Sequence, residues 1–222
     1  IYRADLGDAY PRGIALTATK VGDQVKDPSM YGTVIAIPGD TGYNYTGYTL
    51  NDLKLGTNNY ILTGTGIKNE KTSVRNIYVN AGSKTHLQTG AKWITNYTAK
   101  DKITVMNPKL VKLSGTQFLL LWEEKNTVKN PEGLRPPHEA FLLSAGKIVS
   151  SEICSSPLAL AMCEPVVTKS GTVIWYVTNN DSPVFVEINP YQLSKVQKKA
   201  RNVKTFKTDK TESSDNGQKS GY

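Results

Sequence analysis

Three segments of the chain share one pattern of apolar and polar positions. They are Asp52–Gly66, Lys109–Glu124 and Pro165–Asn179. Each begins with a short run in which apolar and polar residues alternate, continues through a polar turn that contains glycine, and ends in a strongly apolar run. Successive segments stand about 57 residues apart, and a fixed spacing of this size is typical of repeated sheet units that cover one another's apolar faces.

The pattern predicts β-strands, because β-branched and aromatic residues recur between turns rich in glycine and asparagine. For the central unit we expect strands at 109–113, 117–124, 139–144 and 147–153. The segment 125–138 contains three prolines and is expected to be a loop, and Ser144–Lys147 is expected to be a tight hairpin turn. The neighbouring units are expected to have strands at 52–55, 60–65, 74–80, 92–97, 164–169, 172–178 and 183–188, with a turn at Ala81-Gly82.

The expected fold class is all-β, with about four four-stranded blades in a β-propeller-like arrangement. Upstream, the segments 13–17 and 33–37 are expected to be the remains of a further unit. The blades would either close into a small ring or form part of a larger one. A β-sandwich built from hairpins is the alternative, since it uses the same strand and turn signals.

Charge divides the chain into two parts. The 222 residues contain 27 Lys and Arg and 19 Asp and Glu, a formal charge of +8. Residues 191–222 hold eight of the basic residues and three of the acidic ones, so we expect a repeat domain at 1–190 and a basic, flexible tail or linker at 191–222. A basic tail can bind nucleic acid, but basic and aromatic residues are not interleaved in the remainder, and we do not expect a nucleic-acid partner.

Several strings in the chain resemble a known class of sequence. They are Tyr10–Ile14, Ile37–Gly47, Arg75-Asn76, Trp93–Tyr97 and Phe118–Glu124. Together they resemble an uncharacterised propeller-like repeat region of large secreted or surface proteins of Gram-positive bacteria, over residues 5–188. The resemblance implies a secreted or cell-surface location and a propeller architecture, with other domains in a longer chain as neighbours. It implies no reaction.

The string Asp40–Tyr48 is the strongest candidate for a ligand site. Tyr43 and Tyr45 have strand spacing, which places both rings on one face and Asn44 on the other, and Tyr48 extends the aromatic face. Aromatic rings stack on the apolar faces of sugars, while Asp40 and Asn44 suit sugar hydroxyls. Packing between sheets is the competing interpretation, and a protein interface is the third.

Two further residues are candidates for ligand binding. Arg75 stands at the start of an expected strand, where it would clamp a carboxylate, bridge two blades or form a structural ion pair. Trp122 precedes Glu123 and Glu124. Adjacent strand residues point to opposite faces, so the two acids are not expected to share one substrate, and we expect Trp122 to pack between blades with both acids on a rim.

The remaining chemistry is sparse. Cys154 and Cys163 stand close enough along the chain to form a disulfide, and two free, partly buried thiols are the alternative. Neither a CxxC pair nor a histidine cluster accompanies them, so we expect no metal site and no cofactor. Neither His86 nor His138 lies in a known catalytic motif, and the catalytic set is expected to be empty.

The sequence therefore favours a non-catalytic binding or adhesion module of a secreted or cell-surface protein, with a glycan or a protein as ligand. One alternative is a polysaccharide-acting enzyme that uses Asp40, Glu123 and Glu164 as acids, and another is a structural spacer. No run approaches the ~18 apolar residues that cross a bilayer, so no membrane span is expected. The chain begins with Ile1 rather than Met and has no signal-peptide pattern, and we expect a piece of a longer protein.

Overall fold

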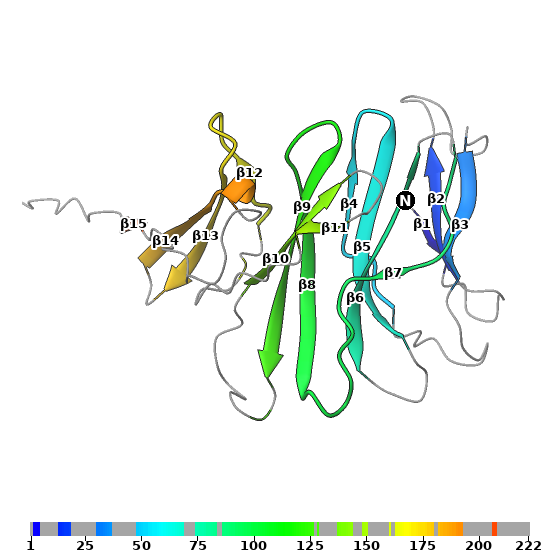
Figure 1. Cartoon of the computed structure of the whole chain (residues 1–222), viewed down its shortest axis with the longest axis horizontal. Helices are drawn as coiled ribbons and strands as arrows, with labels where there is room; N and C mark the ends of the chain where they lie inside the picture. Colours follow the sequence, from blue (N-terminus) through cyan, green and yellow to red (C-terminus); the bar gives the residue numbers. More distant parts are fainter. Residues whose placement is uncertain are drawn as a thin grey trace, which may run out of the picture.

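The fold is all-β, as the sequence predicted. The computed structural model describes residues 2–4, 13–18, 30–36, 48–68, 74–83, 86–126, 128, 137–143, 148–150, 160, 163–179, 182–192 and 206–207. Within them, fifteen strands form four antiparallel sheets, and the one helix is the 3₁₀ turn η1 (Pro190–Gln192) (Figure 1). The described residues do not form a closed ring.

Strands follow one another in chain order within every sheet. The first sheet contains β1 (Tyr2–Ala4), β2 (Gly13–Ala18) and β3 (Met30–Ala36). The second contains β4 (Asp52–Leu55), β5 (Asn59–Ile67), β6 (Arg75–Ser83) and β7 (Lys92–Trp93). The third contains β8 (Ile103–Lys112), β9 (Gln117–Asn126), β10 (Pro137–Leu143) and β11 (Ile148–Ser150). The fourth contains β12 (Val166–Val167), β13 (Val173–Asn179), β14 (Ser182–Ile188) and β15 (Phe206–Lys207).

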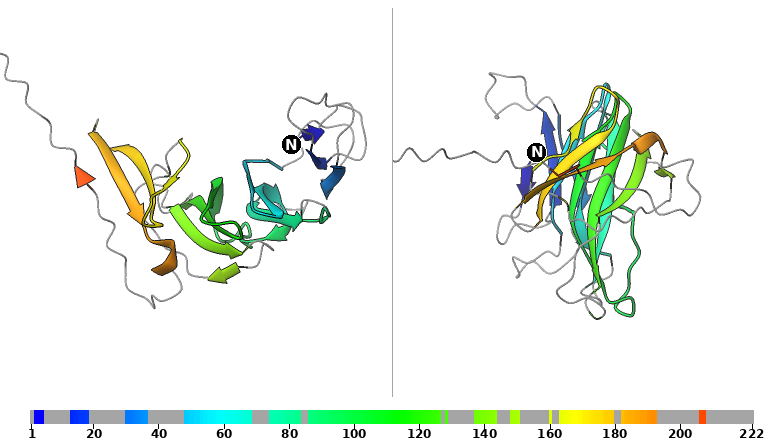
Figure 2. Two further views of the ribbon diagram at one scale, coloured as in Figure 1. Left: turned by 90° about the horizontal axis from the view of Figure 1, so that it is seen from above. Right: turned by 90° about the vertical axis from the view of Figure 1, so that its left-hand side faces the viewer.

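The sheets stand face to face in an open, curved row. Figure 2 (left) shows β4, β8 and β12 toward the concave side of this row, and β11 and β15 toward the convex side. The first two strands of the second, third and fourth sheets come from the three segments that share one sequence pattern. Equivalent strands therefore occupy equivalent places in successive sheets.

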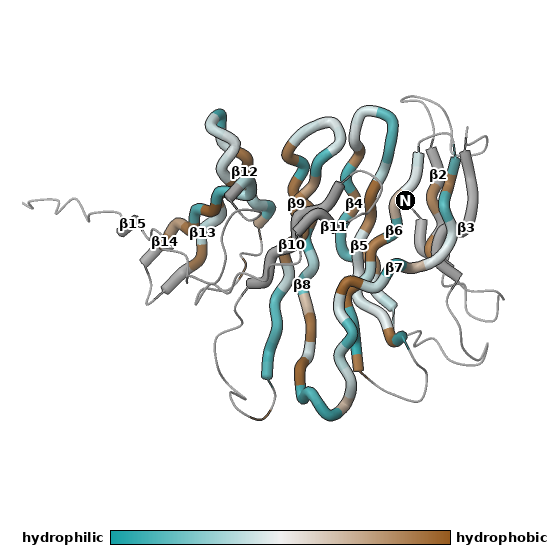
Figure 3. The backbone as a smooth tube through the Cα atoms, in the orientation of Figure 1, coloured by the Kyte–Doolittle hydropathy of each residue, from teal (hydrophilic) through white to brown (hydrophobic). Residues whose placement is uncertain are grey.

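Three apolar cores lie between the four sheets, and Figure 3 shows hydrophobic stretches along the strands that form them. The core between the first and second sheets contains Ile14, Leu16, Tyr48, Tyr60, Leu62 and Tyr78. The core between the second and third contains Ile61, Ile77, Val79, Val105, Leu110, Phe118, Leu120 and Trp122. The core between the third and fourth contains Val111, Leu119, Leu121, Leu160, Val173, Trp175, Val186 and Ile188.

Alternation along each central strand divides its side chains between two cores. In β9, Phe118 and Leu120 face the second sheet, while Leu119 and Leu121 face the fourth. Because both faces of β9 are covered, its sequence is a continuous apolar run instead of an alternating one. The same alternation in β5 places Ile61 in one core and Leu62 in the other.

Several details differ from the predicted strands. Of the strands expected at 92–97 and 164–169, only Lys92–Trp93 (β7) and Val166–Val167 (β12) form. The expected turn at Ala81-Gly82 is wrong, because β6 continues to Ser83 and these residues pair with β5. β8 begins at Ile103 and not at 109, with a register shift between Met106 and Lys109. The sequence analysis also missed β15, which lies within the expected tail and pairs with β14.

Candidate functional site

The tyrosine-rich string is only partly described. Asp40, Tyr43, Asn44 and Tyr45 lie outside the described residues, so their role as a ligand site stays a prediction. Tyr48 is buried in the core between the first and second sheets, where its ring centroid lies 5.7 Å from that of Tyr78 and 6.0 Å from that of Trp93. The Tyr48 ring therefore packs between sheets, and a role for it in ligand binding stays a prediction.

Trp122 and Arg75 lie in different surroundings. Trp122 is 2% exposed and packs between the second and third sheets, on the face of the second sheet opposite to Tyr48. Arg75 is half-buried at the start of β6, and its Nη1 donates a hydrogen bond of 3.2 Å to Oγ1 of Thr65 on β5. The structure does not bring Trp122 and Tyr48 together in one site.

Glu123 and Glu124 face opposite sides of β9, as predicted, but they do not lie on a rim: both are buried. Glu123 accepts hydrogen bonds from Nδ2 of Asn107, at 2.5 Å, and from the backbone amide of Leu160, at 2.9 Å. The expectation of a rim position was wrong because buried carboxylates are tolerated where hydrogen bonds replace water, and these donors come from distant parts of the chain.

Glu124 is held by two other side chains. Its Oε1 accepts hydrogen bonds from Nε1 of Trp122, at 2.9 Å, and from the hydroxyl of Tyr97, at 2.6 Å. Burial, together with the hydrogen bond and the negative charge of Glu124, raises the pKa of Tyr97 far above its ordinary value. The Tyr97 hydroxyl therefore stays neutral and remains a donor, so Glu124 joins the second sheet's last segment to the third sheet.

Cys163 is half-buried and Cys154 lies outside the described residues, so the disulfide stays a prediction. The backbone carbonyl of Cys163 accepts a hydrogen bond of 2.7 Å from Nζ of Lys109 on β8. This bond ties the third sheet to the segment that enters the fourth.

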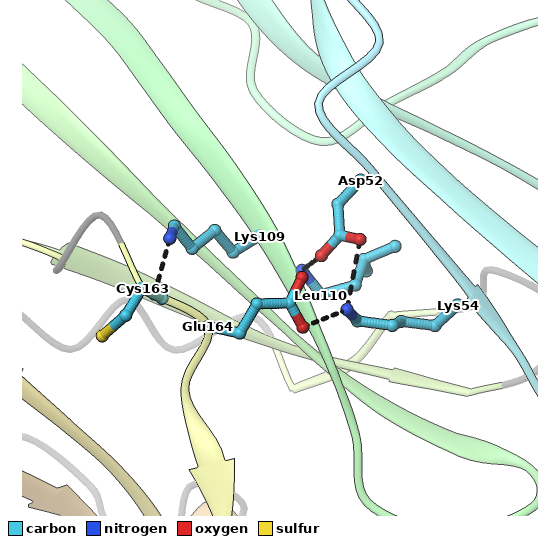
Figure 4. A network of polar contacts seen from close by, with 6 residues as sticks. All are labelled: Asp52, Lys54, Lys109, Leu110, Cys163 and Glu164. Carbon is cyan, nitrogen blue, oxygen red and sulfur yellow. Dashed lines mark hydrogen bonds and ion pairs between the residues drawn. The ribbon is translucent and has the colours of Figure 1, made fainter.

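Charged side chains join the first strands of neighbouring sheets. Oδ2 of Asp52 on β4 accepts a hydrogen bond of 2.8 Å from the backbone amide of Leu110 on β8. Nζ of Lys54 lies 3.3 Å from Oδ1 of Asp52 and 2.6 Å from Oε2 of Glu164, just before β12 (Figure 4). The network of Asp52, Lys54, Lys109 and Glu164 thus links three successive sheets.

Lys54 acts as a fixed positive charge in this network. Burial by itself would lower the pKa of its amine, but the hydrogen bond to Glu164 and the charges of Asp52 and Glu164 outweigh burial, so the pKa is raised. A protonated amine between two carboxylates is a structural cation and not a nucleophile. We therefore assign the network to holding the sheets together.

The two carboxylates of the network are expected to differ in their effect on stability. Asp52→Ala leaves the Leu110 amide without its acceptor and should lower the free energy of unfolding by about 1–3 kcal/mol. The Asp52 side chain is 12% exposed, whereas the Glu164 side chain is 71% exposed. Glu164→Ala removes a surface ion pair and should cost less than about 1 kcal/mol. Urea denaturation of both variants checks this order, and equal losses would contradict it.

An open depression of about 590 Å³ lies on the second sheet. The residues that line it come from β5, β6, β7 and the segment before β7: Asn59, Val79, Asn80, Ala81, Gly82, Ser83, Gln88, Thr89, Gly90, Ala91 and Lys92. Among the described residues, the lining combines amide, hydroxyl and ammonium groups with small apolar residues and contains no carboxylate. We take this depression as the candidate functional site.

Asn80 fixes the wall of the depression. Its buried Nδ2 donates hydrogen bonds of 2.9 Å to the backbone carbonyls of Gln88 and Gly90, and its Oδ1 accepts one from the Tyr60 hydroxyl. Burial raises the pKa of Tyr60, while the hydrogen bond from the backbone of Gln88 opposes this effect. A neutral Tyr60 thus completes the anchor, and the backbone at the site is positioned before any ligand arrives.

Side chains of Gln88, Thr89 and Lys92 are exposed at this fixed wall. Amide and hydroxyl groups can both donate and accept hydrogen bonds, and the ammonium adds a positive charge. Such a lining suits a polar, hydroxyl-rich ligand that carries an acidic group. Sequence reasoning missed the site because its residues are spread over three strands and a connection, and the available signal was only the polar run Gln88–Gly90 after β6.

Within the described residues, no three His, Cys, Asp or Glu side chains gather as a metal site would require. Nor does that part of the chain contain a helix both long and apolar enough to cross a membrane. Comparisons with models of protein families, with curated proteins and with solved structures found no match to this chain.

Proposed function

We propose that the chain is a non-catalytic binding module of a secreted or cell-surface protein and that the depression on the second sheet holds its ligand. The observation that carries this proposal is the lining of the depression, in which donors and acceptors stand on a backbone anchored by Asn80. Rigid walls reduce the conformational entropy that binding costs, so a preorganised polar site favours recognition. The proposed location rests on the sequence resemblance alone.

The proposed architecture is an arc of about four propeller-like blades. Four sheets in chain order, packed face to face with their first strands on the concave side, support it. Blades of four antiparallel strands around a central axis have this arrangement. In a propeller, the depression would lie at the outer half of one blade, since it is bordered by β6 and β7.

A carbohydrate with an acidic group is the proposed class of ligand. Gln88, Thr89 and Asn59 offer groups that pair with sugar hydroxyls, and Lys92 attracts a carboxylate or phosphate. The small residues Ala81 and Ala91 leave room for the body of a sugar ring. A neutral hydroxylated ligand would use the amides and hydroxyls and gain nothing from Lys92.

Removing two of these groups should weaken binding strongly. We expect the chain to bind acidic glycans on an array, and we expect Gln88→Ala with Lys92→Ala to reduce the affinity about 30-fold, which corresponds to about 2 kcal/mol. Lys169→Ala with Ser170→Ala is the matched control, because both residues are exposed in the turn between β12 and β13. The control should bind as the unmodified chain does.

Two outcomes would overturn this site. An array without any hit, from protein shown to be folded by circular dichroism, would favour the structural-spacer alternative. A reproducible hit that survives the Gln88 and Lys92 substitutions would place the ligand elsewhere, and Tyr43→Ala with Tyr45→Ala would then test the tyrosine-rich string.

A further inference from the structure

The fourth sheet has an apolar face that no other described part of the chain covers. Its outer face carries Val166, Ile174, Tyr176, Phe185 and Glu187, which register places side by side. Val166 is 64% exposed, Tyr176 49% and Phe185 37%. The rings of Tyr176 and Phe185 are cross-strand neighbours with centroids 6.4 Å apart. The opposite face of the same sheet is buried against the third sheet.

The strand register shows which positions of the third sheet are equivalent to those on this outer face. The pair of Val111 and Leu119 in the third sheet occupies the place of the pair of Val166 and Ile174 in the fourth. Three positions correspond in this way: Val111 to Val166, Leu119 to Ile174, and Leu121 to Tyr176. All three residues of the third sheet are buried, because the fourth sheet covers them.

The second sheet follows the same rule. Its equivalent position Ile61 on β5 is buried by the third sheet. In each sheet that has a successor, the face that bears these positions is an interface between sheets. The outer face of the fourth sheet therefore continues an established series of interfaces, and an exposed aromatic pair in a water-facing sheet is otherwise a liability for non-specific association.

We propose that this outer face docks a second copy of the chain, whose first sheet takes the place of a following sheet. The first sheet is the natural partner. Its face with Ile14 and Leu16 packs against the second sheet, and no described sheet lies on its other side. The contact is head-to-tail, with the fourth sheet of one copy against the first sheet of the other. The inference extends the proposed propeller arrangement and is independent of the proposed ligand.

The shape of the row indicates that two copies close on each other. Figure 2 (left) shows both ends of the curved row turned toward the same side. Two such rows related by a two-fold axis can meet at both ends, which satisfies two identical head-to-tail contacts at once. Four sheets from each copy make a ring of eight, within the usual propeller range of about four to eight blades.

The oligomeric state of the whole chain tests the proposal. Size-exclusion chromatography with light scattering should give twice the chain mass of 24.3 kDa, falling to that mass on dilution. Tyr176→Lys with Phe185→Lys should give the single-chain mass at every concentration, since two ammonium groups cannot be buried unpaired. Val128→Lys, which changes another exposed apolar residue, should leave the dimer intact.

Two results would overturn the inference. One is a single-chain mass for the unmodified protein at all concentrations. The other is efficient disulfide formation between two copies of a Tyr176→Cys variant in which Cys154 and Cys163 are serine, because that would place the two fourth sheets against each other. A dimer that does not cross-link through position 176 supports the head-to-tail contact.

This outcome is separable from that of the proposed function. The depression lies on the second sheet, so the variant with Lys at 176 and 185 should keep its glycan binding if the proposed site is correct. If the unmodified chain binds glycans but does not dimerise, only the docking inference is wrong. If the chain dimerises but binds no glycan, only the proposed ligand site is wrong.

Discussion

Trp122→Ala is expected to lower the free energy of unfolding by about 3–5 kcal/mol, the range typical of truncating a large aromatic residue in a core. The indole belongs to the core cluster that also contains Ile61 and Val79 of the second sheet and Phe118 and Leu120 of the third. Removing it opens a cavity in the core that joins the second and third sheets. It also takes away one of the hydrogen-bond donors of the buried Glu124 carboxylate, which adds to the cost.

Chemical denaturation followed by circular dichroism measures this loss. Trp122→Phe keeps most of the apolar volume but not the Nε1 donor, so it should fall between the alanine variant and the unmodified chain. Val128→Ala, at an exposed position, should change stability by less than about 0.5 kcal/mol. A Trp122→Ala variant as stable as the Val128 control would show that the second and third sheets do not depend on this core.

Gly64→Ala is expected to destabilise the fold by about 3 kcal/mol or more. A β-carbon at Gly64 would overlap the backbone carbonyl oxygen of Thr49, and the hydroxyl of Tyr78 stands 2.7 Å from its position. Overpacking of this kind usually costs about 1–3 kcal/mol. Here the segment that must move also holds hydrogen bonds, since the Thr49 amide donates to Thr65 and its carbonyl accepts from Tyr78.

Gly115→Ala provides a matched comparison. A β-carbon at Gly115 would also meet a neighbour at close range, but the nearest atom is the side-chain Oγ1 of Thr57 and not a backbone atom. We expect this variant to lose less than about 1 kcal/mol. Thermal unfolding of the two variants side by side separates a backbone obstruction from a side-chain one. Similar melting temperatures would show that the backbone at Thr49 can move aside with little loss of stability.

Strands with a clear local pattern of apolar residues could be predicted from the sequence. Asp52–Leu55 forms β4 over the predicted residues, and the apolar runs that begin near Tyr60, Phe118 and Val173 are β5, β9 and β13. In these strands, apolar content and flanking turn residues point to the same structure. The arrangement of successive residues on opposite faces also allowed the opposite directions of Glu123 and Glu124 to be predicted.

Strand ends and interruptions were harder to predict. β8 extends upstream through Asn107 and Pro108, which look like strand breakers. The structure accommodates them with a register shift, and Asn107 takes a left-handed backbone conformation at φ 51°, which asparagine tolerates better than most residues. β6 runs past Gly82 because pairing with β5 outweighs the preference of glycine for turns.

The candidate site and the buried acids depend on contacts between distant segments. Asn80 meets Gln88 and Gly90 through a turn of the chain, and Glu123 meets Leu160 across a sheet boundary. No local pattern reports such partners, which is why burial of Glu123 and Glu124 was not predicted. The surface location and the propeller-like architecture stay predictions, and the depression became visible only in three dimensions.

Within the described residues, each apolar core joins a sheet only to its neighbour, so packing is passed from sheet to sheet along a line. In such a linear array, each unit contributes its own stability and one coupling term to each adjoining unit. The two inner sheets possess two couplings apiece, whereas the outermost sheets possess one. Local unfolding can therefore begin at either outer sheet and spread to the inner ones. A ring of two copies would have no outer sheet at which unfolding could begin.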